Sequence, residues 1–302
     1  MEAYSDFATV YDTFMDETPY DVWGDFIDEL IRKYGVSKVY DTSGDTVVTE
    51  SNNEFLDDCV SVSDRLNEHS DSACNNNQDY EEAIDEERNL VVELGCGTGS
   101  FTQVMKGLGY DIMGIDMSPE MLNLARQKSA DAGMNIMYLE QDMRELDLYC
   151  TAGTIVSVCD SVNYVLEDEE IIETFKLVNN FLYPGGVFIF DFNTLHKYRD
   201  VIGDTTIAEN REDCSFIWDN YYDDESHINE YDLTIFAKVD SEKELFARSV
   251  ETHYQRGYTL DEMKSFVEAA GLVFITAIDA DTHENPSDDS ERIYIVAREQ
   301  GK

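Results

Sequence analysis

Three glycines, Gly95, Gly97 and Gly99, alternate with other residues directly after Glu93 and a short apolar run. Glycine lets the backbone turn sharply and approach a ligand closely. The backbone N–H groups at the start of a following helix would face that ligand. We therefore expect Glu93, Gly95, Cys96, Gly97 and Gly99 to belong to a ligand-binding loop.

The spacing of this glycine loop separates it from two common phosphate-binding loops. The dinucleotide fingerprint G-x-G-x-x-G would need glycine at Ser100, and a P-loop would need a lysine directly after its glycines, whereas the next lysine is Lys106. The carboxylate of Glu93 disfavours a pyrophosphate and favours a cationic or hydroxyl group. Glycine-rich strand–helix turns also occur for structural reasons, so the interpretation needs support from other residues.

Two acidic residues further along the chain provide that support. Asp116, which is followed by Met117, ends a second apolar strand about twenty residues after the first glycine, where a carboxylate can bind both hydroxyls of a ribose. Asp142 follows a third strand, where it could accept from the exocyclic amine of adenine while Met143 packs on the ring. The structural alternatives are a helix cap for Asp116 and an ordinary loop residue for Asp142.

Alternating strand and helix patterns surround these residues and are typical of a parallel sheet with helices on both faces. The expected strands cover 90–94, 110–115, 135–139, 154–159 and 187–192, and the expected helices cover 101–108, 118–133 and 168–181. A turn is expected at 184–186. Ligands of such sheets bind at the carboxyl ends of the strands, where the glycine loop and both acids fall.

Two segments precede this α/β pattern. Residues 1–40 are expected to form a cap of two helices that break at Pro19. Residues 41–88 hold fifteen Asp or Glu against two Arg, and apolar residues are sparse. This composition predicts an acidic, mostly disordered insertion, with a docking segment for a basic partner as the alternative.

A third segment, residues 194–256, interrupts the α/β pattern with β-like stretches that have no helices between them, so we expect a small antiparallel insertion. The stretches are 215–218, 231–238 and 245–254. Thr259 and Glu262 then form a capping box for a last helix. Two terminal strands, at 272–278 and 292–297, should form a hairpin, which predicts an antiparallel strand at one edge of the sheet.

The glycine loop and the two acids together resemble the class I S-adenosylmethionine-dependent methyltransferases. The segment 91–99 is similar to the first motif of that family, Asp116 to its ribose-binding acid and Asp142 to its adenine-side acid. The segment 183–186 resembles a further hallmark before the fifth strand. The resemblance implies S-adenosyl-L-methionine as the cofactor and a doubly wound, seven-stranded, mostly parallel sheet whose last strand is antiparallel.

The resemblance assigns roles to the larger segments. Residues 89–193 and 257–302 would form the cofactor-binding core, and the insertion at 194–256 would act as a lid or substrate-specificity element over the pocket mouth. The N-terminal residues resemble those of small-molecule methyltransferases, in which a Tyr at the position of Tyr11 can reach the cofactor carboxylate. Simple helix packing is an equally weighted interpretation of Tyr11.

The implied reaction is an in-line attack of a nucleophile on the cofactor methyl group, which requires positioning and desolvation of the reactants. A general base is needed only if the nucleophile carries a proton of high pKa. The titratable candidates near the pocket are Asp160, Tyr164, Asp191, His196, His253 and Tyr254. A structural role is favoured for each of them, so no catalytic residue is assigned. The segment 160–164 lacks the prolines of an Asn/Asp-Pro-Pro-Tyr motif, which weakens a DNA- or protein-amide acceptor.

Composition narrows the acceptor class. The chain of 302 residues has a formal net charge of −44, so phosphate backbones and anionic membranes should repel it. A small-molecule acceptor is therefore expected, and neither a nucleic acid nor a membrane partner is. An RNA (tRNA) methyltransferase, which would need a basic surface, and a non-catalytic adenosyl-ligand binding protein are the alternatives.

The cysteines and the first residues of the chain indicate the cellular compartment in which the protein is expected. Six Cys show no CxxC motif and no zinc-type pairing with the five His, so no metal site is expected and the thiols are expected to be reduced. No signal peptide and no membrane-length apolar run is visible. These features predict a cytoplasmic protein.

Overall fold

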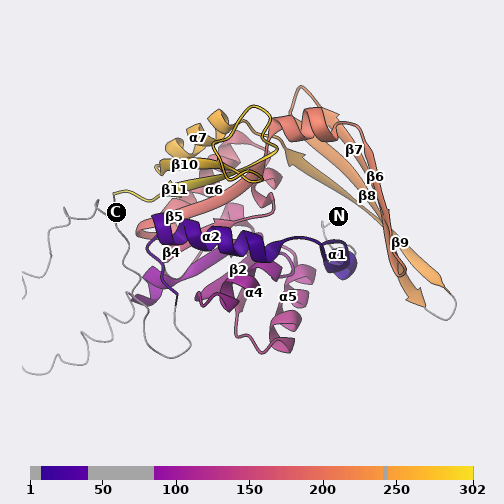
Figure 1. The fold of residues 1–302 in the computed structure, drawn as a ribbon, viewed down its shortest axis with the longest axis horizontal. Coiled ribbons are helices and arrows are strands. Elements are labelled where there is room, and N and C mark those ends of the chain that lie inside the picture. Colours follow the sequence, from indigo (N-terminus) through magenta and orange to yellow (C-terminus); the bar gives the residue numbers. More distant parts are fainter. Residues whose placement is uncertain (1–7, 40–84, 241–243, 302) are drawn as a thin grey trace, which may run out of the picture.

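The computed structural model describes residues 8–39, 85–240 and 244–301. They form a seven-stranded sheet of order β10-β11-β5-β4-β1-β2-β3 and a four-stranded sheet of order β6-β7-β8-β9 (Figure 1). This is the doubly wound sheet with an antiparallel insertion that the sequence predicts.

The elements of the larger sheet alternate with helices along most of the chain. Its strands are β1 (Val91–Leu94), β2 (Ile112–Asp116), β3 (Met137–Glu140), β4 (Ala152–Ser157), β5 (Leu182–Asn193), β10 (Val273–Asp279) and β11 (Arg292–Arg298). The helices are α1 (Ala8–Phe14), α2 (Tyr20–Tyr34), α4 (Ser100–Gly107), α5 (Pro119–Asp131), α6 (Asp168–Phe181) and α7 (Leu260–Ala269). Short helical turns are η2 (Met143–Glu145), η3 (Ser161–Tyr164) and η4 (Lys197–Ile202). The smaller sheet holds β6 (Thr206–Asn210), β7 (Cys214–Asp223), β8 (Ile228–Asp240) and β9 (Leu245–Arg256).

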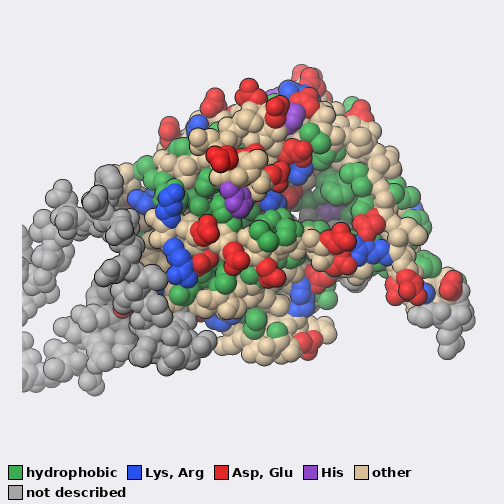
Figure 2. Space-filling model, in the orientation of Figure 1, with side chains coloured by type: hydrophobic (Ala, Val, Ile, Leu, Met, Phe, Trp, Pro, Cys, Tyr) green, Lys and Arg blue, Asp and Glu red, His purple; other side chains and the backbone are tan. Residues whose placement is uncertain are grey.

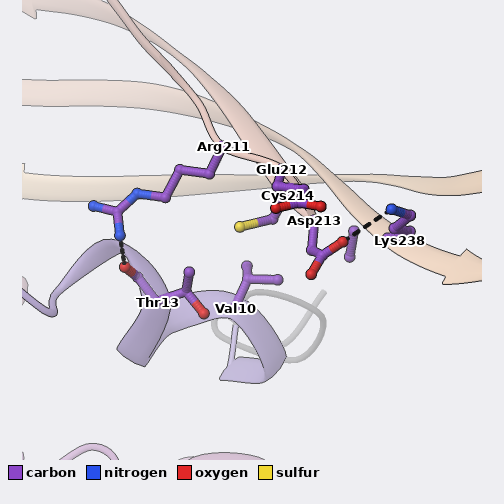
Figure 3. Close-up of a pocket in the computed structure, with 8 residues that line it drawn as sticks. Val10, Thr13, Arg211, Glu212, Asp213, Cys214 and Lys238 are labelled. Atoms are coloured by element: carbon purple, nitrogen blue, oxygen red, sulfur yellow. Dashed lines mark hydrogen bonds and ion pairs between the residues drawn. The ribbon is translucent and has the colours of Figure 1, made fainter. Parts of the chain in front are cut away.

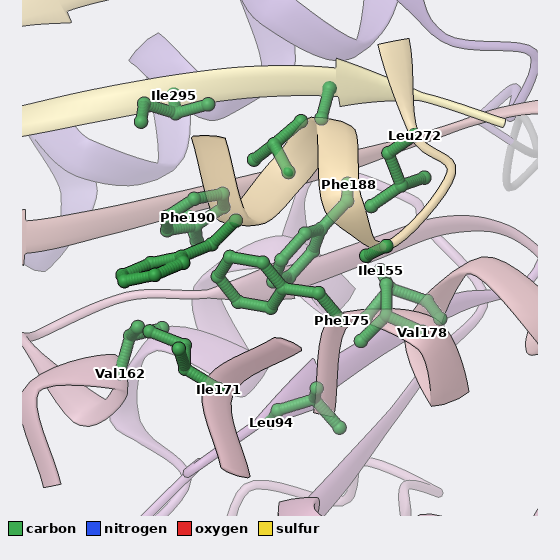
Figure 4. Packing of buried hydrophobic residues seen from close by; sticks show 14 of the residues in the cluster. Leu94, Ile155, Val162, Ile171, Phe175, Val178, Phe188, Phe190, Leu272 and Ile295 are labelled. Carbon is green, nitrogen blue, oxygen red and sulfur yellow. The ribbon is translucent and has the colours of Figure 1, made fainter. Parts of the chain in front are cut away.

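Helices cover both faces of the larger sheet. On one face, α2 and α4 pack Ile27 and Phe101 against Val91 in a single buried cluster. On the other face, α6 brings Phe175 to within 5.3 Å of Phe188, measured between ring centroids, as Figure 4 shows. The central strands are therefore apolar on both sides, which is characteristic of parallel sheets.

The prediction of an antiparallel edge strand is wrong. β11 runs antiparallel to both β5 and β10, and it lies between them, so the antiparallel strand is second from the edge. A hairpin requires only that its two strands oppose each other, and it does not determine which of them pairs with the existing sheet. The implication that the last strand is antiparallel is confirmed.

The segment expected as a turn at 184–186 lies within β5. Ala152 of β4 pairs with Leu182, and Thr154 pairs with Val187, so the intervening residues of β5 bulge out of register. A Cβ on Gly186 would lie 2.8 Å from the carbonyl oxygen of Gly153, so only glycine allows this close approach.

The structure describes only part of the two segments that precede the core. α1 and α2 are separate helices on either side of Pro19, as the sequence predicts. Most of the predicted acidic insertion, residues 41–84, lies outside the described residues, and residues 85–88 are helical. No described helix has the length and apolar character needed to cross a membrane. In the described part of the chain, the thiols of Cys96, Cys150, Cys159 and Cys214 are free.

Candidate active site

The glycine loop joins β1 to α4 and is tied to the end of β2. The backbone N–H of Gly97 donates to Asp116 Oδ2 over 2.8 Å, and the backbone N–H of Ser118 donates to Asp116 Oδ1 over 2.8 Å. Burial raises the pKa of the Asp116 carboxyl, while these backbone donors oppose the shift. Each carboxylate oxygen keeps further acceptor capacity for a ligand hydroxyl.

The three glycines have positive φ angles for different spatial reasons. A Cβ on Gly95 would lie 2.4 Å from Ser161 Oγ, and a Cβ on Gly99 would lie 2.5 Å from Tyr138 Oη. A Cβ on Gly97 would have no atom within 4 Å. Gly95 and Gly99 therefore serve close internal packing, whereas Gly97 borders open space in which a ligand can lie.

That open space is a cavity of about 280 Å³ at the carboxyl ends of β1, β2 and β4. Seven of the ten residues that the sequence analysis selected for cofactor binding line it: Tyr11, Gly95, Gly97, Asp116, Met117, Asp142 and Met143. The remaining lining residues include Glu120, Arg144, Cys159, Ser161 and Tyr164. The cavity thus combines a few polar groups with apolar side chains, as small-molecule sites do.

The other three selected residues do not line this cavity. Glu93 is 2% exposed, and its Oε2 accepts a 2.5 Å hydrogen bond from Thr102 Oγ1 in α4. Burial raises the pKa of Glu93 to about 8, with the nearby Asp116 carboxylate adding to the shift. Burial likewise raises the pKa of the Cys96 thiol. Gly99 packs against Tyr138, as described above.

Asp142 is held by a neighbour that the sequence analysis did not consider. Its two carboxylate oxygens each lie 3.0 Å from Arg144 Nε, and Oδ2 accepts from Arg144 Nη2 over 2.6 Å. Burial acts to raise the pKa of Asp142, but the hydrogen bonds from Arg144 outweigh it and lower the pKa. An adenine amine that donates to Asp142 would therefore share these oxygens with Arg144.

Helix α1 brings Tyr11 to the cavity through contacts over long sequence distances. Asp12 Oδ1 accepts from Thr98 Oγ1 over 2.6 Å, and Asp12 Oδ2 accepts from Lys128 Nζ over 2.7 Å. Lys128 also donates to Ser100 Oγ over 2.7 Å. Asp12 and Lys128 thus connect α1 to the glycine loop and to α5. No local pattern signals this pairing, because 116 positions separate the two residues.

The other side of α1 contacts the smaller sheet. Phe14 packs edge-on against Phe216 with ring centroids 4.7 Å apart. Arg211 Nη1 donates to the carbonyl oxygen of Thr13, and Figure 3 shows this contact beside a second cavity that Cys214 also lines. Helix α1 therefore bridges the cofactor-side loop and the insertion.

Two of the catalytic candidates, Asp160 and Asp191, have structural partners at the end of β4. The backbone N–H groups of Cys159 and Asp160 donate to the two oxygens of Asp191 over 3.2 and 2.8 Å. Cys159 and Asp160 have φ angles of 61° and 52°, which are strained for residues other than glycine. Burial raises the pKa of Asp191 to about 6, while Arg292 opposes the shift. Asp191 therefore fixes the strained loop that carries Cys159 to the cavity.

The other four candidates occupy different surroundings. His196 binds Asp200 at the surface, with 2.9 Å between Nδ1 and Oδ2, and Tyr254 is 44% exposed on the outer face of the smaller sheet. Tyr164 lines the cavity, and its Oη lies 3.4 Å from Nδ1 of His253. The structure thus brings Tyr164 and His253 together, although 89 positions separate them.

Comparisons with known proteins identify the family. A protein-family model described as "Methyltransferase domain" matches residues 91–186. The chain is 34% identical over 215 residues to "Putative methyltransferase YqeM" of Bacillus subtilis (strain 168), a match that covers 70% of this chain and 85% of that protein. It is 27% identical over 295 residues to "Putative methyltransferase GWCH70_2453" of Geobacillus sp. (strain WCH70), covering 98% of this chain and 99% of that protein.

Solved structures agree in fold. A crystal structure of an S-adenosylmethionine-dependent methyltransferase from Clostridium acetobutylicum ATCC 824 superposes with a TM-score of 0.71 at 22% identity, covering 99% of this chain and all of that one. The methyltransferase CcbJ from Streptomyces caelestis superposes with a TM-score of 0.61 at 19% identity, covering 70% of this chain and 83% of that one. The chain belongs to the class I S-adenosylmethionine-dependent methyltransferases.

Proposed function

We propose that this enzyme binds S-adenosyl-L-methionine in the cavity beside Gly97 and transfers its methyl group to a small-molecule acceptor. The observation that carries the proposal is the pairing of Gly97 with Asp116, which sets an open-sided glycine next to a carboxylate at the end of β2. The residues fit the cofactor, because Asp116 can accept from ribose hydroxyls and Met143 offers an apolar surface to the adenine ring.

When bound, the cofactor supplies a methyl group that its sulfonium already makes electrophilic. The chain then has to position the acceptor and to exclude water. Tyr11 covers the cavity from α1, and Ser161 and Tyr164 border it from η3. Glu93 would act indirectly, since its bond to Thr102 connects β1 to α4 directly behind the glycine loop.

The acceptor is proposed to enter between the core and the smaller sheet, where Figure 2 shows the surface to be hollowed. Trp218 on the inner face of β7 lies 4.7 Å from Tyr231, measured between ring centroids. Its buried indole Nε1 has no hydrogen-bond partner among the described residues, which is uncommon for a buried polar group. The residues predicted as a lid, 194–256, would therefore contribute directly to acceptor specificity.

A small acceptor agrees with charge and with the names of structural neighbours. A net charge of −44 opposes binding of RNA, which would be the main alternative acceptor. Two proteins of similar fold are named as an amino pentose methyltransferase, CalS10 of Micromonospora echinaspora, and a sugar N-methyltransferase, KedS8 of Streptoalloteichus sp.. The cytoplasmic location stays a prediction.

Transfer of a tritiated methyl group from the labelled cofactor into a cell metabolite extract, followed by chromatography, tests the acceptor class. We expect a labelled small molecule that is absent with the Asp116→Ala variant. Trp218→Leu should change which acceptors are labelled while cofactor affinity is kept, and Tyr221→Phe on the exposed outer face is the matched control. Label found only in RNA, with retention of RNA on filters at low salt, would contradict the proposal.

A further inference from the structure

A connected set of polar side chains leads from the cavity into the smaller sheet. Tyr164 lines the cavity, and its Oη lies 2.7 Å from Tyr231 Oη and 3.4 Å from His253 Nδ1. On the far side of the imidazole, His253 Nε2 lies 3.4 Å from Glu251 Oε2. Both ring nitrogens of His253 thus have an oxygen close by, one toward the cavity and one away from it.

The histidine and the glutamate are buried where the fold does not need polar groups. His253 is 2% exposed and Glu251 is 4% exposed, and both lie on the inner face of β9. In the neighbouring strand β8, the residue that pairs with Glu251 is the apolar Leu233. Burying an imidazole and a carboxylate costs free energy unless they interact, so this pair is expensive to keep for packing alone.

The geometry of the imidazole is fixed by its surroundings. Its ring stacks on Tyr231 with centroids 4.9 Å apart and planes 9° apart, and Tyr164 meets it edge-on. Among the described residues, the titratable groups that face His253 include Tyr164 from η3, Tyr231 from β8 and Glu251 from β9. A histidine held in this way has one orientation and one preferred tautomer.

We propose that Tyr164, His253 and Glu251 form a proton relay that takes the proton from the attacking atom of the methyl acceptor. This inference rests on the proposed function. The acceptor lone pair forms the new bond to the methyl carbon, and the electron pair of the broken carbon–sulfur bond stays on sulfur. The acceptor proton passes to Tyr164 Oη, whose own proton passes to His253 Nδ1.

The relay accounts for each group in turn. Tyr164 is the only member that borders the cavity, so it is the group that would touch the acceptor, and His253 and Glu251 act through it. The imidazolium that forms on His253 is stabilised by the adjacent Glu251 carboxylate, as a carboxylate does for the histidine of a hydrolytic triad. The relay further specifies the acceptor class, because only an amine or hydroxyl whose attacking atom carries a proton needs it.

Histidine ¹⁵N NMR tests the resting state of the relay without an acceptor. The His253→Gln variant assigns the signal by its disappearance. We expect neutral His253 with its proton on Nε2, since Nδ1 must be free to accept from Tyr164. A proton on Nδ1 would overturn the relay, because that nitrogen could then not receive one.

Kinetics test the relay in turnover. His253→Gln and Tyr164→Phe should each lower the rate of labelled methyl transfer about 100-fold or more, at unchanged cofactor affinity. In Glu251→Gln the acidic limb of the rate profile should move to lower pH, because the imidazolium loses its neighbouring negative charge. His227→Asn, in the turn before β8, is the matched control and should keep the wild-type rate and profile.

The outcomes separate the relay from the function on which it rests. Wild-type transfer rates in His253→Gln, or an unmoved profile in Glu251→Gln, with cofactor binding intact, would overturn the relay alone. Calorimetry that registers no cofactor binding to the wild-type protein would overturn the proposed function, and the relay with it.

Discussion

The Gly97 backbone and the Asp116 carboxylate are joined by a 2.8 Å hydrogen bond, so the glycine loop after β1 and the acid after β2 form one structural unit. The unit sets the positive φ of Gly97 and aims the open side of this glycine into the cavity. Substitutions in the loop should therefore affect cofactor binding and stability differently, according to what surrounds each position.

Gly97→Ala and Gly99→Ala provide that contrast. Both place a Cβ in the left-handed region, which costs roughly 1–2 kcal/mol. Gly99→Ala also drives its Cβ toward Tyr138 Oη, which adds about 1–3 kcal/mol of overpacking. Urea unfolding should find Gly99→Ala the less stable variant. Calorimetry should find that Gly97→Ala, which intrudes on the cavity, weakens cofactor binding about tenfold or more. Equal effects in both assays would contradict this assignment.

The Asp12–Lys128 ion pair should influence cofactor affinity more than stability. The side chains are 41% and 30% exposed, so Lys128→Gln should cost no more than about 1 kcal/mol of unfolding free energy. Because the pair anchors the helix that carries Tyr11, cofactor affinity should fall several-fold, and wild-type affinity should decline with added salt. Lys106→Gln removes an exposed pair with Asp111 and serves as the control. Identical cofactor affinity in the two variants would show that this anchor has no role in binding.

Glu93 should make stability depend on pH. Its pKa is about 8 in the folded chain against an ordinary value of 4.5, so between these pH values the folded state holds a proton that the unfolded state has released. The folded state is then destabilised as pH rises through this window. The unfolding free energy of Glu93→Gln should therefore increase relative to that of the wild type by roughly 1.4 kcal/mol per pH unit. Urea titrations from pH 4.5 to 9 measure the difference. A difference that does not change with pH would refute the raised pKa.

Asp191 should contribute to stability through its buried ion pair with Arg292. Asp191→Asn leaves Arg292 without its buried counter-charge, 3.6 Å away, and should cost about 3 kcal/mol or more. Adding Arg292→Gln should cost less than the sum of the two single changes, because the two groups interact. Additive losses in a double-mutant cycle would contradict the coupling.

The sequence predicts the elements whose residue patterns are local. The Ser118 cap with Pro119 and the capping box of Thr259 with Glu262 are both confirmed, and the β-branched run of β4 is a strand as expected. By contrast, β6 is not predicted: its residues Thr206–Asn210 are largely exposed at an edge, so they lack the apolar alternation that indicates a strand.

Side-chain geometry and long-range partners limit how much of the site can be predicted from the sequence. Glycine spacing and acid positions are visible in the sequence because each lies within a single strand–loop–helix unit. The grip of Arg144 on Asp142 depends on side-chain geometry, and the meeting of Tyr164 with His253 depends on how the smaller sheet folds back over η3. Neither follows from periodicity or spacing, and only the tertiary structure reveals them.

Calorimetric titration with S-adenosyl-L-methionine of the wild-type protein and of Asp116→Ala tests the central claim most directly. We expect saturable binding at one site in the wild type and at least about 100-fold weaker binding in the variant, which loses both the ribose contacts and the anchor of Gly97. Asp131→Ala at the end of α5 should bind like the wild type. Absence of heat with the wild type, or equal affinity with and without the Asp116 carboxylate, would contradict the account.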